Sequence, residues 1–238
     1  MSLPVTYALI HKPILFSDVQ TRQVKRKSLV TKNEHMRAML RVCQQNQIPY
    51  RYVLADSWFS AKDNLTFIRQ TLKKHFVVAL KSNRTVALSY EAKRQGAFTR
   101  IDGCDLPEHQ PVQGWIKGLD FPVLVLRQVF TNQDGSTGTL YLACSDLTGD
   151  GPTIEAIYQK RWNVEIFHKT LKSHAALAKS PTRRVRTQSN HCFMALYAAG
   201  RLESLRIKHQ LKHFALRSRL YLNAIRCAFE ELQTLKTA

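Results

Sequence analysis

The sequence predicts an α/β fold with a β-rich middle segment and a helical C-terminal third. Apolar runs of strand length alternate with amphipathic helical stretches in residues 1–82. Helical periodicity disappears in residues 83–150, where Gly, Pro, Asp and Asn separate short β-rich runs. Residues 151–238 then return to helical periodicity. With 238 residues, 44% of them hydrophobic, the chain is long enough to bury a large core.

The first segment opens with an apolar run, residues 3–10, which predicts a strand. Pro4 lacks a backbone donor, so this strand is expected at a sheet edge or to begin there. Thr31 and Glu34 have the spacing of a capping box. They predict the start of a helix that runs to about residue 47.

Two further apolar runs, residues 51–56 and 75–80, predict buried strands. The first ends in Asp56, and polar groups at the C-terminal ends of such strands are often functional. A helix is expected between them, over residues 61–73. Its buried face is predicted to carry three apolar residues at helical spacing, namely Leu65, Ile68 and Leu72.

The middle segment ends in two long apolar runs, residues 121–130 and 138–146, which predict a β-hairpin. The breaker run GDGP follows. A basic link, residues 180–188, then separates the first two of the expected helices. These helices cover residues 153–174, 189–208 and 212–235.

The charge balance is strongly basic, with 36 Lys and Arg against 17 Asp and Glu, a net charge of +19. A polyanion is the expected partner, and nucleic acid is the commonest one. An ordinary basic surface is the alternative. The sequence shows neither a membrane span nor a signal peptide. Its five scattered cysteines suit reduced thiols in a cytosol better than a disulfide framework.

One predicted helix face combines four reactive side chains. Each residue of an α-helix turns by about 100°, so Tyr158, Arg161, Glu165 and Lys172 fall within an arc of about 60°. A neighbouring apolar stripe would dock the helix on a core. The helix is therefore expected to present a phenol, a guanidinium, a carboxylate and an ammonium together.

Asp56, at the end of a predicted strand, and Glu165, in the middle of a predicted helix, are the two acids that we consider as candidates for catalysis. Enzymes that cut phosphodiesters with two metal ions need converging carboxylates. Each acid also has a simpler interpretation. Asp56 fits a turn or a helix N-cap, and Glu165 fits an ion pair with Arg161 or Lys169 one turn away.

The joint spacing of Tyr158, Arg161, Glu165 and Lys172 resembles the YREK motif of bacterial insertion-sequence transposases with a DDE catalytic domain. The segment ADSWF around Asp56 resembles the stretch that carries the second catalytic Asp of that family. A β-rich insertion between this Asp and the catalytic Glu is also typical, and residues 83–150 occupy that place. The resemblance covers nearly the whole chain.

This resemblance implies a ribonuclease-H-like core in residues 1–82, an all-β insertion in residues 83–150 and a helical region in residues 151–238. Asp56 and Glu165 would be catalytic ligands of Mg²⁺, with Mn²⁺ as a substitute. Contacts to transposon-end phosphates are expected from Tyr158, Arg161 and Lys172. Apart from the resemblance, Lys81 and Arg84 lie just past the predicted strand at residues 75–80, where they would either extend this phosphate track or belong to a solvated loop. The protein would act in the bacterial cytoplasm, on the nucleoid, as a homodimer in a synaptic complex.

A DDE site needs three acids, and no residue before Asp56 has the position of the first one. Asp18, the first acid of the chain, is expected in a loop. Residues 3–10 resemble the third strand of the core, so the first two strands would be missing and the edge of the fourth would be open. The chain is therefore expected to be the C-terminal part of a transposase, truncated and impaired in catalysis.

Three alternatives stay open at this point. The chain can be a non-catalytic DNA-binding remnant of a transposase. Salt-dependent DNA binding without metal-dependent cleavage would favour this alternative. It can be an unrelated basic nuclease or RNA-binding protein. A preference for single-stranded or A-form RNA over duplex transposon ends would support this alternative. It can also be a product with no stable fold, which would melt without cooperativity.

Overall fold

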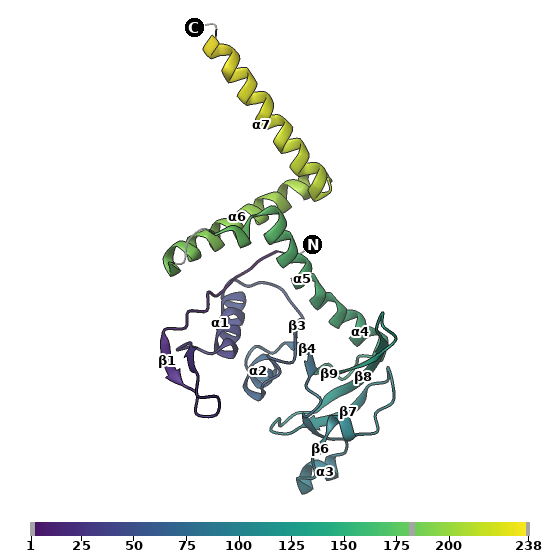
Figure 1. Ribbon diagram of the computed structural model, residues 1–238. Coiled ribbons are helices and arrows are strands. Elements are labelled where there is room, and N and C mark those ends of the chain that lie inside the picture. The colour runs from purple at the N-terminus through teal and green to yellow at the C-terminus, as the bar shows by residue number, and fades with distance from the viewer. Residues whose placement is uncertain (1–2, 181–183, 237–238) are drawn as a thin grey trace. The chain divides into compact units, whose positions relative to one another are not determined.

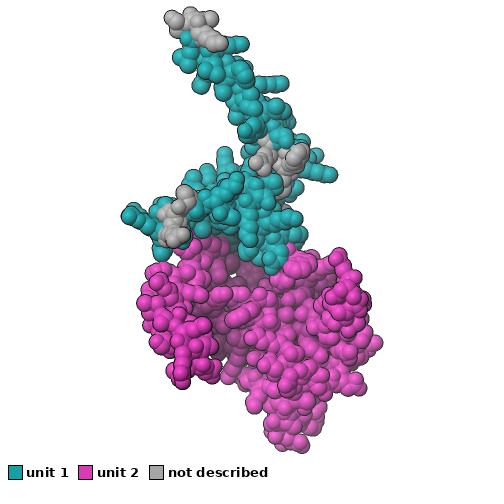
Figure 2. Space-filling model, viewed as in Figure 1, with its two compact units in different colours: residues 1–5, 163–238 teal, residues 6–162 magenta. Residues whose placement is uncertain are grey.

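The computed structural model describes residues 3–180 and 184–236 (Figure 1). The chain forms two compact units (Figure 2). Residues 6–162 form one, called the sheet unit below. Residues 1–5 and 163–238 form the other, called the helical unit. The boundary falls inside the stretch 153–174, which the sequence predicts to be one helix.

The sheet unit is built on a seven-stranded sheet with the order β3-β4-β9-β8-β7-β5-β6. Strands β3 and β4 are parallel, and each of the other neighbouring pairs is antiparallel. This arrangement confirms a mixed α/β fold. The strands are β3 (Tyr52–Ala55), β4 (His75–Leu80), β5 (Thr85–Ala87), β6 (Thr99–Arg100), β7 (Val112–Ile116), β8 (Val123–Thr131) and β9 (Thr137–Cys144).

Strand β4 has apolar packing on both faces. Phe76, Val78 and Leu80 point into a core that includes residues of the helices before it, whereas Val77 and Ala79 point into a second core. Successive side chains of a strand alternate between faces, so a strand covered on both sides needs a continuous apolar run. The sequence HFVVAL meets this requirement, and the predicted buried strand is confirmed.

Helices α1 (Lys32–Gln45) and α2 (Lys62–Thr66) pack on the first of these cores. Helix α1 begins with the predicted capping box, in which Thr31 and Glu34 exchange side-chain and backbone hydrogen bonds. Helix α2 continues into a π-helical turn, η1 (Phe67–Thr71). The predicted buried face is confirmed, because Leu65 and Ile68 are fully buried and Leu72 is nearly so.

The middle segment extends the same sheet. Strands β8 and β9 form the predicted hairpin, paired from Leu124 with Cys144 to Thr131 with Thr137. Strand β9 also pairs with β4, which joins the hairpin to the first strands. Between β5 and β7 lie a short helix, α3 (Tyr90–Gln95), and a 3₁₀ turn, η2 (Ile101–Gly103).

The predicted continuous helix over residues 153–174 is wrong in one respect. The structure has α4 (Gly151–Gln159), a 3₁₀ turn η3 (Lys160–Trp162) and α5 (Asn163–His174). Three weaker helix formers follow each other at the break, Trp162, Asn163 and Val164. Arg161 lies in the 3₁₀ turn, so the uniform turn of 100° per residue does not apply across the motif.

The predicted strand over residues 3–10 is not formed. A strand needs a neighbour for its backbone groups, and Pro4 supplies no N–H donor. Instead, a hairpin of β1 (Ile14–Ser17) and β2 (Val24–Lys27) follows, which the sequence pattern did not indicate. Strand β3 forms one edge of the seven-stranded sheet.

The helical unit contains α5, a 3₁₀ turn η4 (Leu177–Lys179), α6 (Val185–His209) and α7 (His213–Lys236). Part of the predicted basic link, residues 181–183, lies outside the described residues, and its last residues already belong to α6. Leu171 of α5 and Ala195 and Ala199 of α6 are buried. Among the helices of the described residues, none has the length and apolar character needed to cross a membrane.

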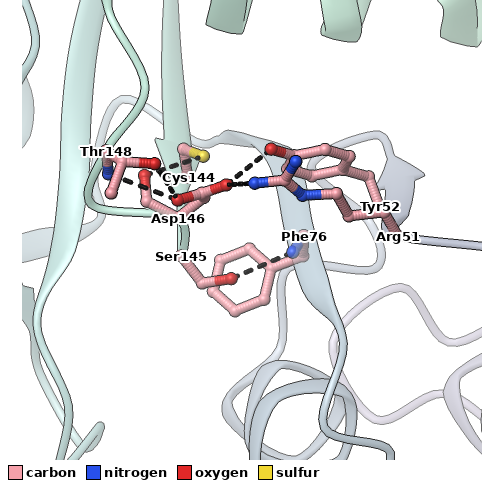
Figure 3. A network of polar contacts seen from close by, with 7 residues as sticks. All are labelled: Arg51, Tyr52, Phe76, Cys144, Ser145, Asp146 and Thr148. Carbon is pink, nitrogen blue, oxygen red and sulfur yellow. Dashed lines mark hydrogen bonds and ion pairs between the residues drawn. The ribbon is translucent and has the colours of Figure 1, made fainter.

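A polar network fastens the edge strand β3 to the end of β9 (Figure 3). One oxygen of the buried Asp146 carboxylate accepts hydrogen bonds from the Tyr52 hydroxyl at 2.6 Å and from Arg51 at 2.8 Å. The other accepts from the backbone and hydroxyl of Thr148. The Tyr52 hydrogen bond, followed by those of Thr148, holds the pKa of Asp146 well below its usual range. Burial and the same carboxylate raise the pKa of Tyr52 to about 12.

This network makes stability depend on pH. A carboxyl whose pKa is lowered by folding stabilises the fold above its unfolded pKa, and this contribution is lost as the pH falls below about 4. We expect Asp146→Asn to lower the free energy of unfolding at neutral pH by about 1–3 kcal/mol, because it leaves buried donors poorly paired. It should also flatten the decline in stability between pH 5 and pH 3, measured by urea unfolding. Asp120→Asn, at an exposed position between β7 and β8, is the control. An equal decline in wild type and Asp146→Asn would contradict this assignment.

Candidate functional site

Asp56 directly follows the edge strand β3, as the sequence predicts. Its Oδ1 accepts a hydrogen bond from the backbone N–H of Trp58 at 2.9 Å, and its carbonyl accepts one from the N–H of Phe59 at 3.1 Å. The turn interpretation of Asp56 is therefore confirmed. This turn does not exclude a ligand role, because one carboxylate oxygen carries the turn and Oδ2 is a second acceptor.

The buried side chain of Asn64 holds this turn in place. Its amide nitrogen donates to the carbonyl of Phe59 at 3.0 Å and to Asn33 of α1 at 2.9 Å. Its carbonyl oxygen accepts from Arg37 of α1 at 2.7 Å. One side chain thus connects two helices to the loop that carries Asp56. Sequence analysis missed Asn64, although a polar residue directly before the buried Leu65 was a signal.

Helix α4 positions the first half of the predicted phosphate-binding face. Asp150 caps it, and its Oδ1 accepts from the N–H of Thr153 at 3.0 Å. Gly151 allows a close approach to the loop before β7, because any side chain there would overlap the carbonyl of His109. His109 in turn contacts Glu155 of α4 at 2.7 Å. Ile157 and Tyr158 pack on the second core of the sheet.

Tyr158, Arg161 and Trp162 form a cluster beside the Asp56 turn. The Arg161 guanidinium lies over both rings, 5.7 Å from the Tyr158 centroid and 5.1 Å from that of Trp162. Burial raises the pKa of Tyr158; the Arg161 charge opposes this rise, and the Asp56 carboxylate adds to it. Asp56 and Tyr158 are therefore within electrostatic range. The three aromatic and basic side chains also line a pocket of about 540 Å³.

Glu165 and Lys172 lie on exposed positions of α5, in the helical unit. The structure thus divides the four-residue motif between its two units. It brings Asp56, Tyr158 and Arg161 together within the sheet unit. The joint presentation of all four motif side chains, and their contacts with a ligand, stay predictions.

Lys81 and Arg84 follow β4 and line a second pocket of about 470 Å³ near the Asp56 turn. Trp58 borders the same pocket, with 69% of its surface exposed. The ammonium groups of Lys32 and Lys81 lie 5.6 and 5.2 Å from its ring centroid. Sequence analysis missed Trp58 as a site residue; its position two residues after Asp56 was the available signal.

The described acids do not by themselves form a metal centre. Asp18 lies at the β1–β2 turn, where it accepts from two backbone N–H groups and from Lys25. Glu34 is engaged in the capping box. Over residues 3–180 and 184–236, no three His, Cys, Asp or Glu side chains come close enough together to hold a metal ion. Asp18 and Glu34 are thus both engaged in local structure.

Comparison with known protein families gives one match. A family model described as "Transposase DDE domain" matches residues 7–199. The matched range contains every candidate residue named above. A comparison with curated proteins finds no match.

Gly151 offers a test of how α4 positions the Tyr158 cluster. We expect Gly151→Ala to lower the free energy of unfolding by about 1–3 kcal/mol, because the added methyl group overlaps backbone that cannot rotate away. Chemical denaturation measures this loss. The control is Gly200→Ala, at an open helical position, which should stabilise the protein by about 0.5–1 kcal/mol. A neutral Gly151→Ala would show that the loop is free to move.

Proposed function

Because the chain belongs to the transposase DDE domain family, we propose that it binds transposon-end DNA through the sheet unit's Tyr158 cluster and the α5 residues that complete the motif. The family membership also removes the alternative of an unrelated nuclease or RNA-binding protein. The proximity of Asp56, Tyr158 and Arg161 carries the proposal, because it sets an acid beside phosphate-binding groups.

Each proposed contact suits a phosphodiester. Arg161 offers a planar fork of N–H donors, Lys172 a point charge and Tyr158 a neutral O–H donor. These groups position a backbone without reading its sequence. Lys81 and Arg84 would extend the track along the end of β4. The net charge of +19 supplies the long-range attraction.

Transposases of this family generally use divalent metal ions, and we propose Asp56 and Glu165 as two of the ligands for Mg²⁺ or Mn²⁺. Bound metal would supply charge neutralisation at the scissile phosphate. A full DDE site needs a third carboxylate, and no residue before Asp56 has the sequence position of the first one. The chain by itself is then truncated with respect to a full DDE site and impaired in cleavage. We place its action on bacterial cytoplasmic DNA, as a homodimer in a synaptic complex.

The alternative is a non-catalytic DNA-binding remnant of a transposase. One observation favours it: within the described residues both early acids serve local structure, Asp18 in a turn and Glu34 in a helix cap. Such a protein would bind DNA ends in a salt-dependent manner and would not cleave them when Mg²⁺ is added.

Arg161→Ala tests the phosphate contacts. We expect weaker binding to duplex DNA and a salt slope, log Kd against log salt concentration, that falls by about one. Fluorescence anisotropy over a series of salt concentrations measures both. The matched control, Arg94→Ala on an exposed position of α3, should leave the slope unchanged. If both variants behave like the wild type, Arg161 has a structural role only.

Glu165→Gln and Asp56→Asn test the metal ligands. In a chain completed with the first catalytic Asp, each should abolish Mg²⁺-dependent strand cleavage of DNA that carries the ends of the encoding element. Binding should stay equal or become tighter, because removing a negative charge cannot weaken attraction to phosphates. Asp63→Asn in the first turn of α2 is the control and should leave both properties intact. Loss of binding together with cleavage would contradict the ligand assignment.

A further inference from the structure

The pocket beside the Asp56 turn contains, besides the proposed phosphate contacts Lys81 and Arg84, two residues that those contacts do not account for, Lys117 and Trp58. Besides small and polar residues, it contains three cations, Lys81, Arg84 and Lys117, and no acid. Its volume of about 470 Å³ lies within the range of small-molecule and cofactor sites, about 300–1,000 Å³. A concave site with this charge favours an anion.

The cations stand on firmly held backbone. The N–H of Arg84 donates to the carbonyl of Lys81 at 2.9 Å, and its carbonyl accepts from Ile101 at 2.8 Å. The N–H of Lys117 donates to the carbonyl of Thr85 at 3.0 Å. These bonds connect the turn after β4 to β7. The backbone positions that carry the three cations are thus set before any ligand arrives, and only their side chains have to be ordered on binding.

One N–H donor of the Arg84 side chain has no hydrogen-bond acceptor among the described residues. Its Nε is buried, and among the described residues no hydrogen-bond partner reaches it. Burial also lowers the pKa of Arg84, although a guanidinium stays protonated at neutral pH. A phosphate oxygen is an acceptor of matching charge and geometry. Arg84 lines the pocket, so a phosphate there would face its guanidinium, whose planar fork carries further N–H donors besides the buried Nε.

Trp58 adds a flat apolar surface at the mouth of this pocket. Its indole is 69% exposed, which is unusual for the largest side chain unless it has a partner. The two lysines near its ring are flexible, and a phosphate in the pocket would draw Lys81 toward itself. The ring face is then open to a planar group. A nucleotide combines such a group with a phosphate.

We propose that this pocket binds one unpaired nucleotide, with its base stacked on Trp58 and its phosphate held by Arg84, Lys81 and Lys117. The inference deepens the proposed DNA-binding function and rests on it for the source of the nucleotide. The ligand chemistry is that of a nucleoside monophosphate, either within a DNA strand or free.

The test compares the affinities of the full chain for four probes: a blunt duplex, the same duplex with a single-nucleotide 5′-phosphorylated overhang, free dAMP and inorganic phosphate. We expect the overhang duplex to bind about tenfold more tightly than the blunt one, because base–aromatic stacking contributes on this scale. We expect dAMP to bind more tightly than phosphate, as measured by calorimetry.

Two variants locate the effect. Trp58→Ala should remove the preference for the overhang and leave blunt-duplex affinity unchanged, whereas Tyr90→Ala, another exposed aromatic of the sheet unit, should keep the preference. Lys117→Gln should weaken the binding of dAMP, and Lys73→Gln, an exposed lysine next to the opposite end of β4, should not. Thermal melts confirm that each variant folds.

The outcomes distinguish a failure of the pocket proposal from a failure of the proposed DNA-binding function. Equal affinity of the wild type for both duplexes, or an equal loss for both in Trp58→Ala, overturns the pocket proposal while DNA binding stands. Binding of dAMP without binding of either duplex supports the pocket and rejects the DNA-binding function. If phosphate binds as tightly as dAMP, stacking on Trp58 is rejected.

Discussion

Strand β4 is covered on both faces, and five of its six residues, Phe76 to Leu80, alternate between two apolar cores. The helices before it fill one core and α4 fills the other, so both candidate site segments depend on this strand. Asp56 reaches its position because β3 pairs with β4 in parallel, and Tyr158 reaches its position because α4 packs on the opposite face. A polar substitution within β4 would disturb both at once, since each buried position would leave an unsatisfied group.

Polar contacts then fix the orientation of the helices and loops, which apolar packing does not determine. Apolar burial is non-directional, so it holds elements together without setting their orientation. Asn64 sets the Asp56 loop against two helices, and Asp146 fastens the first residues of β3 to the end of β9. Gly151 and His109 set the start of α4. The candidate site therefore rests on a few buried hydrogen bonds, where the loss of one partner is costly.

Local patterns predicted the elements that are decided locally. The capping box of Thr31 and the apolar spacing of Leu65, Ile68 and Leu72 gave α1 and the α2–η1 helix correctly, since each depends on neighbours within a few residues. The run at residues 3–10 has the composition of a strand and forms none, because a strand needs a partner that local sequence does not supply. For the same reason the pairing of β4 with β9 was not predictable.

The sequence by itself determined the inventory of the candidate site: its two acids, the basic and aromatic side chains proposed to bind phosphate, their spacing and the net positive charge. It also carried the family pattern, which the match over residues 7–199 confirms. Only the tertiary structure decided which of these residues meet. It interrupted the motif helix at residues 160–162, placed the Arg161 guanidinium over two aromatic rings and assembled the pocket at Trp58 from three separate segments. Such contacts depend on packing between residues that are far apart in the chain, so local sequence patterns do not specify them.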